Sequence, residues 1–130
     1  MDIEQILKTY RTIAVVGLSP RPDRPSHGVA RYMQSMGYRI VPVRPGTEEI
    51  LGEKAYGSLK DIPFPVEIVD VFRRSDTVLP IAEEAVDIGA RVLWLQEGVI
   101  NDEAEKLCKD AGMDVVMDRC ILKEHRKAGI

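Results

Sequence analysis

The segment TIAVVGLSPRPDRPSHGVARYMQSM, residues 12–36, decides the fold of this 130-residue chain. It begins with an unbroken apolar run over residues 13–16, which is typical of a parallel β-strand covered by helices on both faces. Gly17 ends that run. From Ser26, which we expect to be the N-cap, apolar residues recur at helical spacing until Gly37 stops the helix. The pattern predicts a strand, a turn and a helix whose N-terminus faces the turn, an arrangement that binds anions.

The loop between this strand and helix is longer than the roughly two to six residues that usually suffice. Three prolines fix backbone φ angles within it and so make it stiff. Arg21 and Arg24 give it positive charge. The alternative is a long connection with no ligand, but the combination favours a phosphate-binding loop.

Four further apolar runs predict the remaining strands. The five predicted strands are residues 13–16, 39–43, 66–72, 92–95 and 115–117. Helices are expected at residues 2–10, 26–36, 75–89, 101–112 and 120–127, with Ser75 and Asn101 as N-caps, and residues 44–65 read as an irregular crossover with a short helical turn. The alternation indicates one α/β domain over residues 1–130: a Rossmann-like, doubly wound, five-stranded parallel sheet with helices on both faces.

Composition and charge argue against several classes of protein. The net charge of −3 argues against a surface dedicated to nucleic acid. Residues 1–10 carry charges and lack a long apolar run, so we expect neither a signal peptide nor a membrane span there. Cys108 and Cys120 show no disulfide or CxxC pattern, which favours free thiols in a reducing cytoplasm.

Arginines cluster where the predicted strands end. In a doubly wound sheet, ligands bind beyond the carboxyl ends of the strands, where the strand order reverses. These ends carry Ser19, Arg21 and Arg24 after the first strand, Arg44 after the second, Arg73 and Arg74 after the third, Gln96 and Glu97 after the fourth, and Arg119 after the fifth. Solvated loop arginines are the alternative, but guanidinium groups suit phosphate, so the set predicts a ligand with several negative charges.

The usual dinucleotide fingerprint is missing. Ser19 stands where the second glycine of G-x-G-x-x-G belongs, and Arg44 follows the second strand in place of an acidic residue for the ribose hydroxyls. An arginine at that point suits a phosphorylated ribose. The pattern therefore favours coenzyme A or NADP over NAD.

The chain resembles the small, stand-alone CoA-binding proteins, which are similar to the nucleotide-binding domain at the start of the succinyl-CoA synthetase alpha subunit. The residues that carry this resemblance are Val16–Pro20, Arg24–Ser26, Gly28, Gly37–Tyr38, Pro42–Pro45, Leu51–Gly52, Asp70–Arg74, Met117–Cys120, Glu124 and His125. One departure is Arg44, which fills a position where the family pattern often has asparagine.

The resemblance implies that coenzyme A lies across the sheet ends, with its pyrophosphate near the loop and the helix start. It also implies that the adenine and ribose lie beside the ends of the second and third strands. The predicted cofactor-binding residues are Gly17, Leu18, Ser19, Arg24, Ser26, His27, Val43, Arg44, Pro45, Phe72, Arg73 and Gln96. We expect no metal site.

No motif in the sequence indicates catalysis. There is no G-x-S-x-G, no Ser, His and Asp arrangement and no His and Cys spacing for a metal. We therefore expect a protein that binds CoA or an acyl-CoA, acting as a regulator or carrier with a protein partner. A mixed disulfide between Cys120 and CoA is one alternative to a buried structural thiol. The rival functions are an NADP-dependent reductase or acyl-CoA-using transferase, and a protein interaction module.

Overall fold

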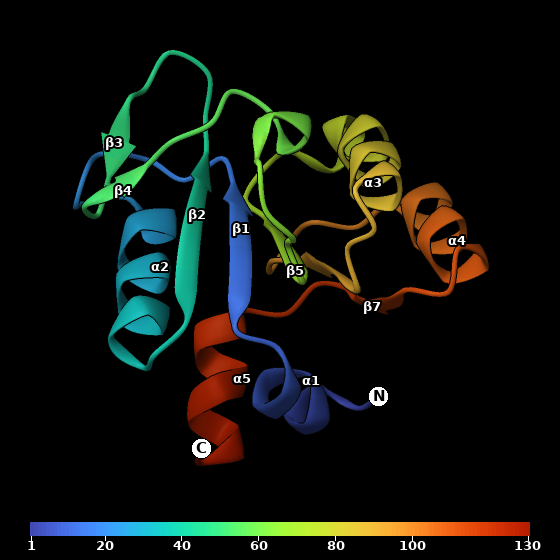
Figure 1. Ribbon diagram of the computed structural model, residues 1–130. Helices are drawn as coiled ribbons and strands as arrows, with labels where there is room; N and C mark the ends of the chain where they lie inside the picture. The colour runs from blue at the N-terminus through green and yellow to red at the C-terminus, as the bar shows by residue number, and fades with distance from the viewer.

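Five parallel strands form the central sheet of the computed structural model, which describes residues 1–130 (Figure 1). They are β1 (Thr12–Val16), β2 (Arg39–Val43), β5 (Ile68–Val71), β6 (Val92–Leu95) and β7 (Asp114–Val116). Their order across the sheet is β2-β1-β5-β6-β7. The chain first winds outward from β1 to β2 and then returns to place β5 on the other side of β1. The strand order therefore reverses between β1 and β5, which confirms the doubly wound, Rossmann-like fold.

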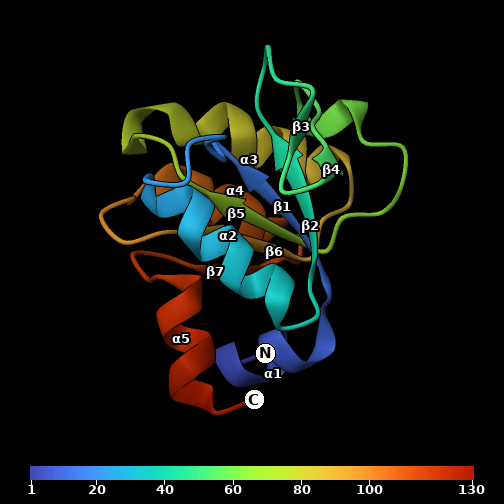
Figure 2. The same ribbon diagram turned by 90° about the vertical axis from the view of Figure 1, so that its left-hand side faces the viewer.

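Five helices cover both faces of the sheet, as predicted (Figures 1 and 2). They are α1 (Ile3–Thr9), α2 (Pro25–Ser35), α3 (Val78–Asp87), α4 (Asp102–Asp110) and α5 (Ile121–Ala128). The helices α1, α2 and α5 pack on one face, and α3 and α4 pack on the other. In β1, Ile13 and Val15 belong to the first of these cores, and Ala14 and Val16 to the second. This explains the unbroken apolar run. None of the helices is long and apolar enough to cross a membrane.

The crossover over residues 44–65 contains a hairpin that the sequence did not predict. Its strands are β3 (Glu49–Ile50) and β4 (Glu53–Lys54), which pair in antiparallel fashion. At the turn, Leu51 and Gly52 have φ of 57° and 76°. Positive φ at both central residues is what a tight two-residue hairpin needs, but leucine rarely adopts it, so the residue types at this turn do not predict a hairpin. The expected helical turn is present as the 3₁₀ helix η1 (Leu59–Asp61).

Two predicted N-caps differ from the structure and one agrees. The Asn101 side chain accepts a hydrogen bond from the Ala104 N–H at 2.9 Å, which confirms it as the cap of α4. Ser75 does not cap α3. It begins the 3₁₀ turn η2 (Ser75–Thr77), and its hydroxyl accepts the Ile100 N–H at 2.9 Å, so it joins the loop after β5 to the loop after β6.

The strand β5 carries a buried acid. Asp70 is 1% exposed, and its Oδ1 has no hydrogen-bond partner. Burial raises the pKa of this carboxyl well above 3.8. An unfolded chain releases this proton at lower pH than the folded one, so this group makes folding less favourable as pH rises above 3.8.

A buried histidine holds the C-terminal helix against α2. Nδ1 of His125 lies 2.8 Å from the Tyr32 hydroxyl, and its ring meets the edges of Tyr32 and Tyr38 at centroid distances of 5.5 and 5.7 Å. Burial, and then the positive charge of Arg11, lower the pKa of His125 below 6.5. The imidazole is therefore neutral in the folded protein at pH 7.

We expect the free energy of unfolding to fall as pH is lowered below 6.5, because the unfolded chain then binds a proton that folded His125 rejects. Urea unfolding at pH 7.5 and at pH 5.5 measures this loss. In the His125→Gln variant the loss should be smaller, while the contribution of Asp70 should be the same in both proteins. Equal pH dependence in the two proteins would contradict the prediction.

Candidate functional site

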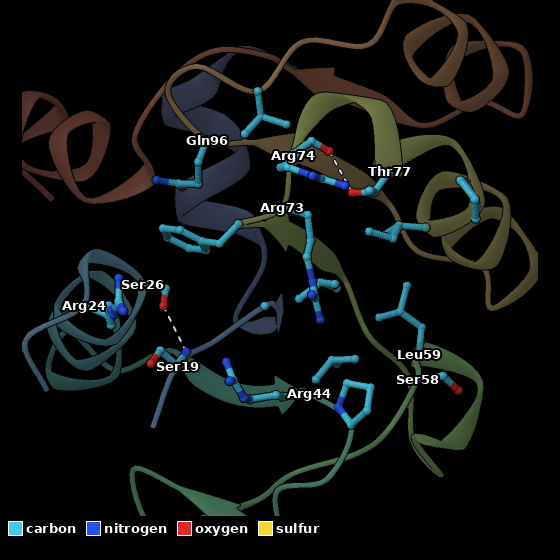
Figure 3. Close-up of a pocket in the computed structure, with 18 of the residues that line it drawn as sticks. Ser19, Arg24, Ser26, Arg44, Ser58, Leu59, Arg73, Arg74, Thr77 and Gln96 are labelled. Atoms are coloured by element: carbon cyan, nitrogen blue, oxygen red, sulfur yellow. Dashed lines mark hydrogen bonds between the residues drawn. The ribbon is translucent and has the colours of Figure 1, made fainter. Parts of the chain in front are cut away.

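A cavity of about 1120 Å³ opens at the carboxyl ends of β1, β2, β5 and β6 (Figure 3). The first residues after these strands line it: Gly17 after β1, Arg44 after β2, Phe72 after β5 and Gln96 after β6. This is the place where the strand order reverses. The cavity therefore lies where ligands bind in folds of this kind.

Ten of the twelve predicted binding residues line this cavity. They are Gly17, Ser19, Arg24, Ser26, Val43, Arg44, Pro45, Phe72, Arg73 and Gln96. Leu18 and His27 do not line it: Leu18 is fully buried in the core, and Nδ1 of His27 lies 3.0 Å from the carbonyl oxygen of Ser19. Arg119 is also outside the cavity, 3.5 Å from Glu124. The expectation that the loop after the fifth strand adds an arginine to the site is wrong.

Gly17 lets two strand ends approach each other at the point of reversal. Its φ is +89°, and its N–H donates to the Val43 carbonyl at 3.0 Å. A Cβ built at this position would lie 2.4 Å from the carbonyl oxygen of Phe72. Only glycine has both the conformation and the space that this turn requires.

The loop after β1 is braced by its own side chains. Ser26 Oγ accepts the Ser19 N–H at 2.9 Å (Figure 3). Ser19 Oγ accepts the Arg21 N–H at 3.1 Å. The predicted N-cap role of Ser26 is therefore wrong, because α2 begins at Pro25 with Arg24 as its N-cap. Proline suits the first helical position since its missing N–H costs nothing there. These two hydrogen bonds constrain the loop in addition to its prolines, and the Ser19 N–H is not free to bind a ligand.

The N-terminus of α2 faces the cavity and adds its dipole to the site. Arg24, Pro25 and Ser26 all line the cavity, and the first turn of the helix contains no acidic residue. The positive end of an eleven-residue helix therefore meets the ligand space without a neutralising charge.

Three arginines in the cavity have no acidic partner. Five arginines line it, and two of these are paired: Arg21 with Asp23 at 3.2 Å and Arg74 with Asp76 at 3.5 Å. The other three, Arg24, Arg44 and Arg73, form no ion pair and no side-chain hydrogen bond, and they follow three different segments of the fold (Figure 3). Unpaired guanidinium groups converging on one space are what a polyanionic ligand requires.

A hydrogen bond from the start of α5 fixes the side chain of Gln96. Its side-chain oxygen accepts the Ile121 N–H at 3.1 Å, at the start of α5, and Nε1 of Trp94 donates to the Arg119 carbonyl at 2.8 Å. Gln96 is buried, and its amide nitrogen has no partner within the protein. This nitrogen is a fixed donor at the β6 side of the cavity.

The sequence reasoning missed the wall that η1 and α3 contribute. This wall consists of Ser58, Leu59, Thr77, Pro80, Ile81 and Glu84. Ile81 shares the helical spacing of the core residues on α3, so its pattern indicated packing alone. Nothing in the spacing of Glu84 distinguishes it from a solvated glutamate.

Neither cysteine lines the cavity, and both are buried, free thiols. Burial raises the pKa of Cys108 to about 11, so this thiol stays protonated at neutral pH. No group of His, Cys, Asp and Glu side chains is arranged to hold a metal ion.

Together, the fold and this cavity define a Rossmann-like α/β domain with a cationic ligand site at its strand-order reversal. The family model described as "CoA binding domain" matches residues 11–126, and the chain belongs to this family. It is 49% identical over 124 residues to the uncharacterised protein YneT of Bacillus subtilis strain 168, covering 95% of this chain and 92% of that protein.

Two further comparisons extend this relationship. A solved structure of a hypothetical protein from Pyrococcus horikoshii OT3 superposes with a TM-score of 0.96 at 40% identity, covering 99% of this chain and 91% of the other. An ADP-forming acetate–CoA ligase of Archaeoglobus fulgidus is 26% identical over 98 residues, which are 74% of this chain and 15% of the ligase. The chain is thus similar to two proteins over more than nine tenths of their length and to a minor part of a larger enzyme.

Proposed function

We propose that the cavity binds coenzyme A or an acyl-CoA and that the protein does not catalyse a reaction on it. The observation that carries this proposal is the convergence of Arg24, Arg44 and Arg73, all without acidic partners, around the N-terminus of α2. Coenzyme A carries a pyrophosphate and a separate ribose 3′-phosphate, so it offers anionic groups at two places. Family membership and the ligase's name support the same ligand.

The arrangement suggests a place for each phosphate group. The pyrophosphate is assigned to the start of α2, where Arg24 and the Ser26 N–H lie beside the braced loop. The ribose phosphate is assigned to Arg44, which follows β2 and is half-buried. Arg73 lies next to Gly17, with its Nε 3.2 Å from the Cβ position of that residue.

The side chains that line the cavity support binding without turnover. They include no His, Cys, Lys or Asp. Both histidines are buried and engaged elsewhere, His27 with Ser19 and His125 with Tyr32. Such a lining holds a charged ligand but offers few groups for proton transfer or nucleophilic attack. We therefore propose a carrier or regulator that presents CoA to a protein partner in the cytoplasm.

Thermal unfolding with added ligands tests this function. CoA should raise the melting temperature more than 3′-dephospho-CoA, NADP or ATP at the same concentration, because a ligand that binds only the folded state stabilises it by RT ln(1 + [L]/Kd), which increases as the ligand binds more tightly. A larger shift with NADP would favour the reductase. No shift with any of these ligands would favour an interaction module.

Arg44→Ala should reduce the preference for CoA over 3′-dephospho-CoA by roughly 10-fold, because a hydrogen bond between charged groups contributes about 1.5–3 kcal/mol. Isothermal titration calorimetry with both ligands measures the ratio. Arg24→Ala is the matched control, since it should weaken both ligands alike and leave the ratio unchanged. An unchanged ratio in Arg44→Ala would remove this residue from the ribose-phosphate site.

A further inference from the structure

The two edges of the central sheet are protected differently. The strand β2 forms one edge, and the crossover pairs with its end: the Arg44 N–H donates to the Tyr56 carbonyl at 2.8 Å, and the Tyr56 N–H donates to the Pro42 carbonyl at 3.0 Å. The strand β7 forms the other edge, between α4 and the N-terminus (Figure 1). No strand lies beyond it, and residues 114–117 contain neither proline nor lysine, which proteins use to block strand pairing. The edge at β7 is therefore open to a further strand.

Val115 directs its backbone groups away from the sheet. In a parallel ladder, alternate residues of an edge strand bond to the neighbouring strand. The Asp114 N–H donates to the Arg91 carbonyl at 3.0 Å, so Asp114 and Val116 face β6. The N–H and C=O of Val115, which lies between them, point outward. Because β7 has only three residues, a strand that pairs with it needs side-chain contacts as well.

A groove of about 910 Å³ follows this open edge. The strand β7 forms its floor, the N-terminal segment with the start of α1 forms one wall, and the end of α4 with the turn after it forms the other. The lining residues are Met1–Glu4, Ile6, Lys109, Gly112, Met113, Asp114–Met117 and Arg119. A groove with an unpaired strand along its floor accepts an extended segment by strand addition.

The charged groups of this groove are all engaged within the chain. Glu4 pairs with Lys8, Lys109 with Glu105, Asp114 with the amino group of Met1 and Arg119 with Glu124, and Asp2 caps α1. The ligand cavity differs, because three of its arginines lack acidic partners. The β7 groove thus has no free charge with which to select a charged ligand, and two such grooves can meet without repulsion between unpaired charges.

The side chains of the open edge match their own two-fold image. Met113, Val115 and Met117 alternate along the chain and all pack against the α3 and α4 core. In an antiparallel pairing of two copies centred on Val115, Met113 of one copy lies opposite Met117 of the other, and Val115 lies opposite Val115. Methionine is flexible and adapts well to such contacts. A foreign peptide is the alternative occupant, but the groove offers no free charge to select one.

We infer that a second copy of this chain binds along β7, by antiparallel pairing about a two-fold axis at Val115. The Val115 N–H of each copy then donates to the Val115 carbonyl of the other, which is the hydrogen-bonded pair of an antiparallel ladder. The two central sheets join into one. Because the axis is perpendicular to the sheet, α1 lies beside α1 and α4 beside α4 on the two faces.

The pairing ends at two copies. A two-fold contact uses the same surface on both partners, and the other edge of each sheet is already paired with the crossover. The dimer also leaves both ligand cavities open, since neither β7 nor α1 lines them. The inference is therefore independent of the proposed function.

Sedimentation equilibrium tests the dimer. Over about 1–100 μM, the wild-type protein should show the mass of two chains and dissociate on dilution. Val115→Pro should weaken the dimer by at least about 10-fold, because both symmetry-related N–H donors are lost. The lost N–H faces outward, so the ladder with β6 is kept. Val115→Thr is the matched control, since it has nearly the same shape, keeps the N–H and should dimerise as wild type does.

Hydrogen exchange supplies a measurement that needs no variant. The Val115 amide should exchange slowly in concentrated wild-type protein and faster on dilution, because its N–H is bonded only in the dimer. The Val116 amide is the internal control. It faces β6 and should exchange slowly at both concentrations.

The outcomes decide between this surface and others. A wild-type protein that is monomeric at about 100 μM overturns the inference. A dimer that survives in Val115→Pro, or a Val115 amide whose exchange does not depend on concentration, overturns the location of the interface. If Val115→Pro fails to fold, the exchange measurement decides alone. CoA affinity in folded Val115→Pro should match wild type, so a failure here leaves the proposed function untouched.

Discussion

Gly17→Ala should destabilise the protein by about 3 kcal/mol and abolish measurable CoA binding. A residue with a Cβ loses roughly 1–2 kcal/mol in the left-handed region, and Gly17 has φ of +89°. The new Cβ would also lie 2.4 Å from the carbonyl oxygen of Phe72, a backbone atom that cannot rotate away. Forcing this contact apart adds a cost of about 1–3 kcal/mol. It also separates β1 from β5 at the bottom of the cavity.

Urea unfolding and calorimetry with CoA measure the two effects. Gly28→Ala is the matched control, because Gly28 lies within α2 and a Cβ there has no atom within 4 Å. Alanine should be neutral or stabilise by about 0.5–1 kcal/mol at this helical position. If Gly17→Ala unfolded at the same urea concentration as wild type, the close approach of the strand ends would be refuted.

Arg73→Glu should weaken CoA binding by roughly 100-fold while leaving the stability of the fold unchanged. Arg73 is exposed, forms no ion pair and lies at the strand-order reversal, with its Nε 3.2 Å from the Cβ position of Gly17. Removing its charge-assisted hydrogen bonds to phosphate costs about 1.5–3 kcal/mol, and the new carboxylate adds repulsion. Arg73 has no ion-pair or hydrogen-bond partner within the protein to lose, so the free energy of unfolding should not change.

Calorimetry at two salt concentrations separates direct contact from long-range attraction. Arg31→Glu makes the same charge change at an exposed position of α2 outside the cavity. It should weaken binding only slightly, and the difference should vanish at high salt because exposed charges are screened. The loss of CoA affinity in Arg73→Glu should persist at high salt. If both variants lost CoA affinity to the same extent, Arg73 would act only through its charge and would not contact the ligand.

The strands and helices were predictable where one physical signal dominated. The run over residues 13–16 is apolar throughout because both faces of β1 are buried, and Asn101 is followed by a run of helix-forming residues that its side chain caps. Ser26 was misassigned because two signals competed. Pro25 takes the first helical position, and the serine hydroxyl, one residue further on, turns back to the loop.

One side of the candidate site could be predicted from the sequence, and the other side could not. Residues that directly follow parallel strands must meet at one sheet edge, so the arginine side of the cavity follows from the strand assignments. The placement of Glu84 depends on how η1 docks against α3, a tertiary contact with no trace in local spacing. Arg119 shows the opposite error, since it follows a strand yet the start of α5 carries it toward Glu124.

The hydrogen bonds among Ser19, Ser26 and Arg21 have a kinetic consequence. A loop that is already in its final shape before the ligand arrives has little conformational entropy left to lose on association. Capture then needs no slow rearrangement, so the observed rate in a stopped-flow experiment should increase linearly with ligand concentration and show no plateau. Release should be equally direct, as the proposed carrier role requires.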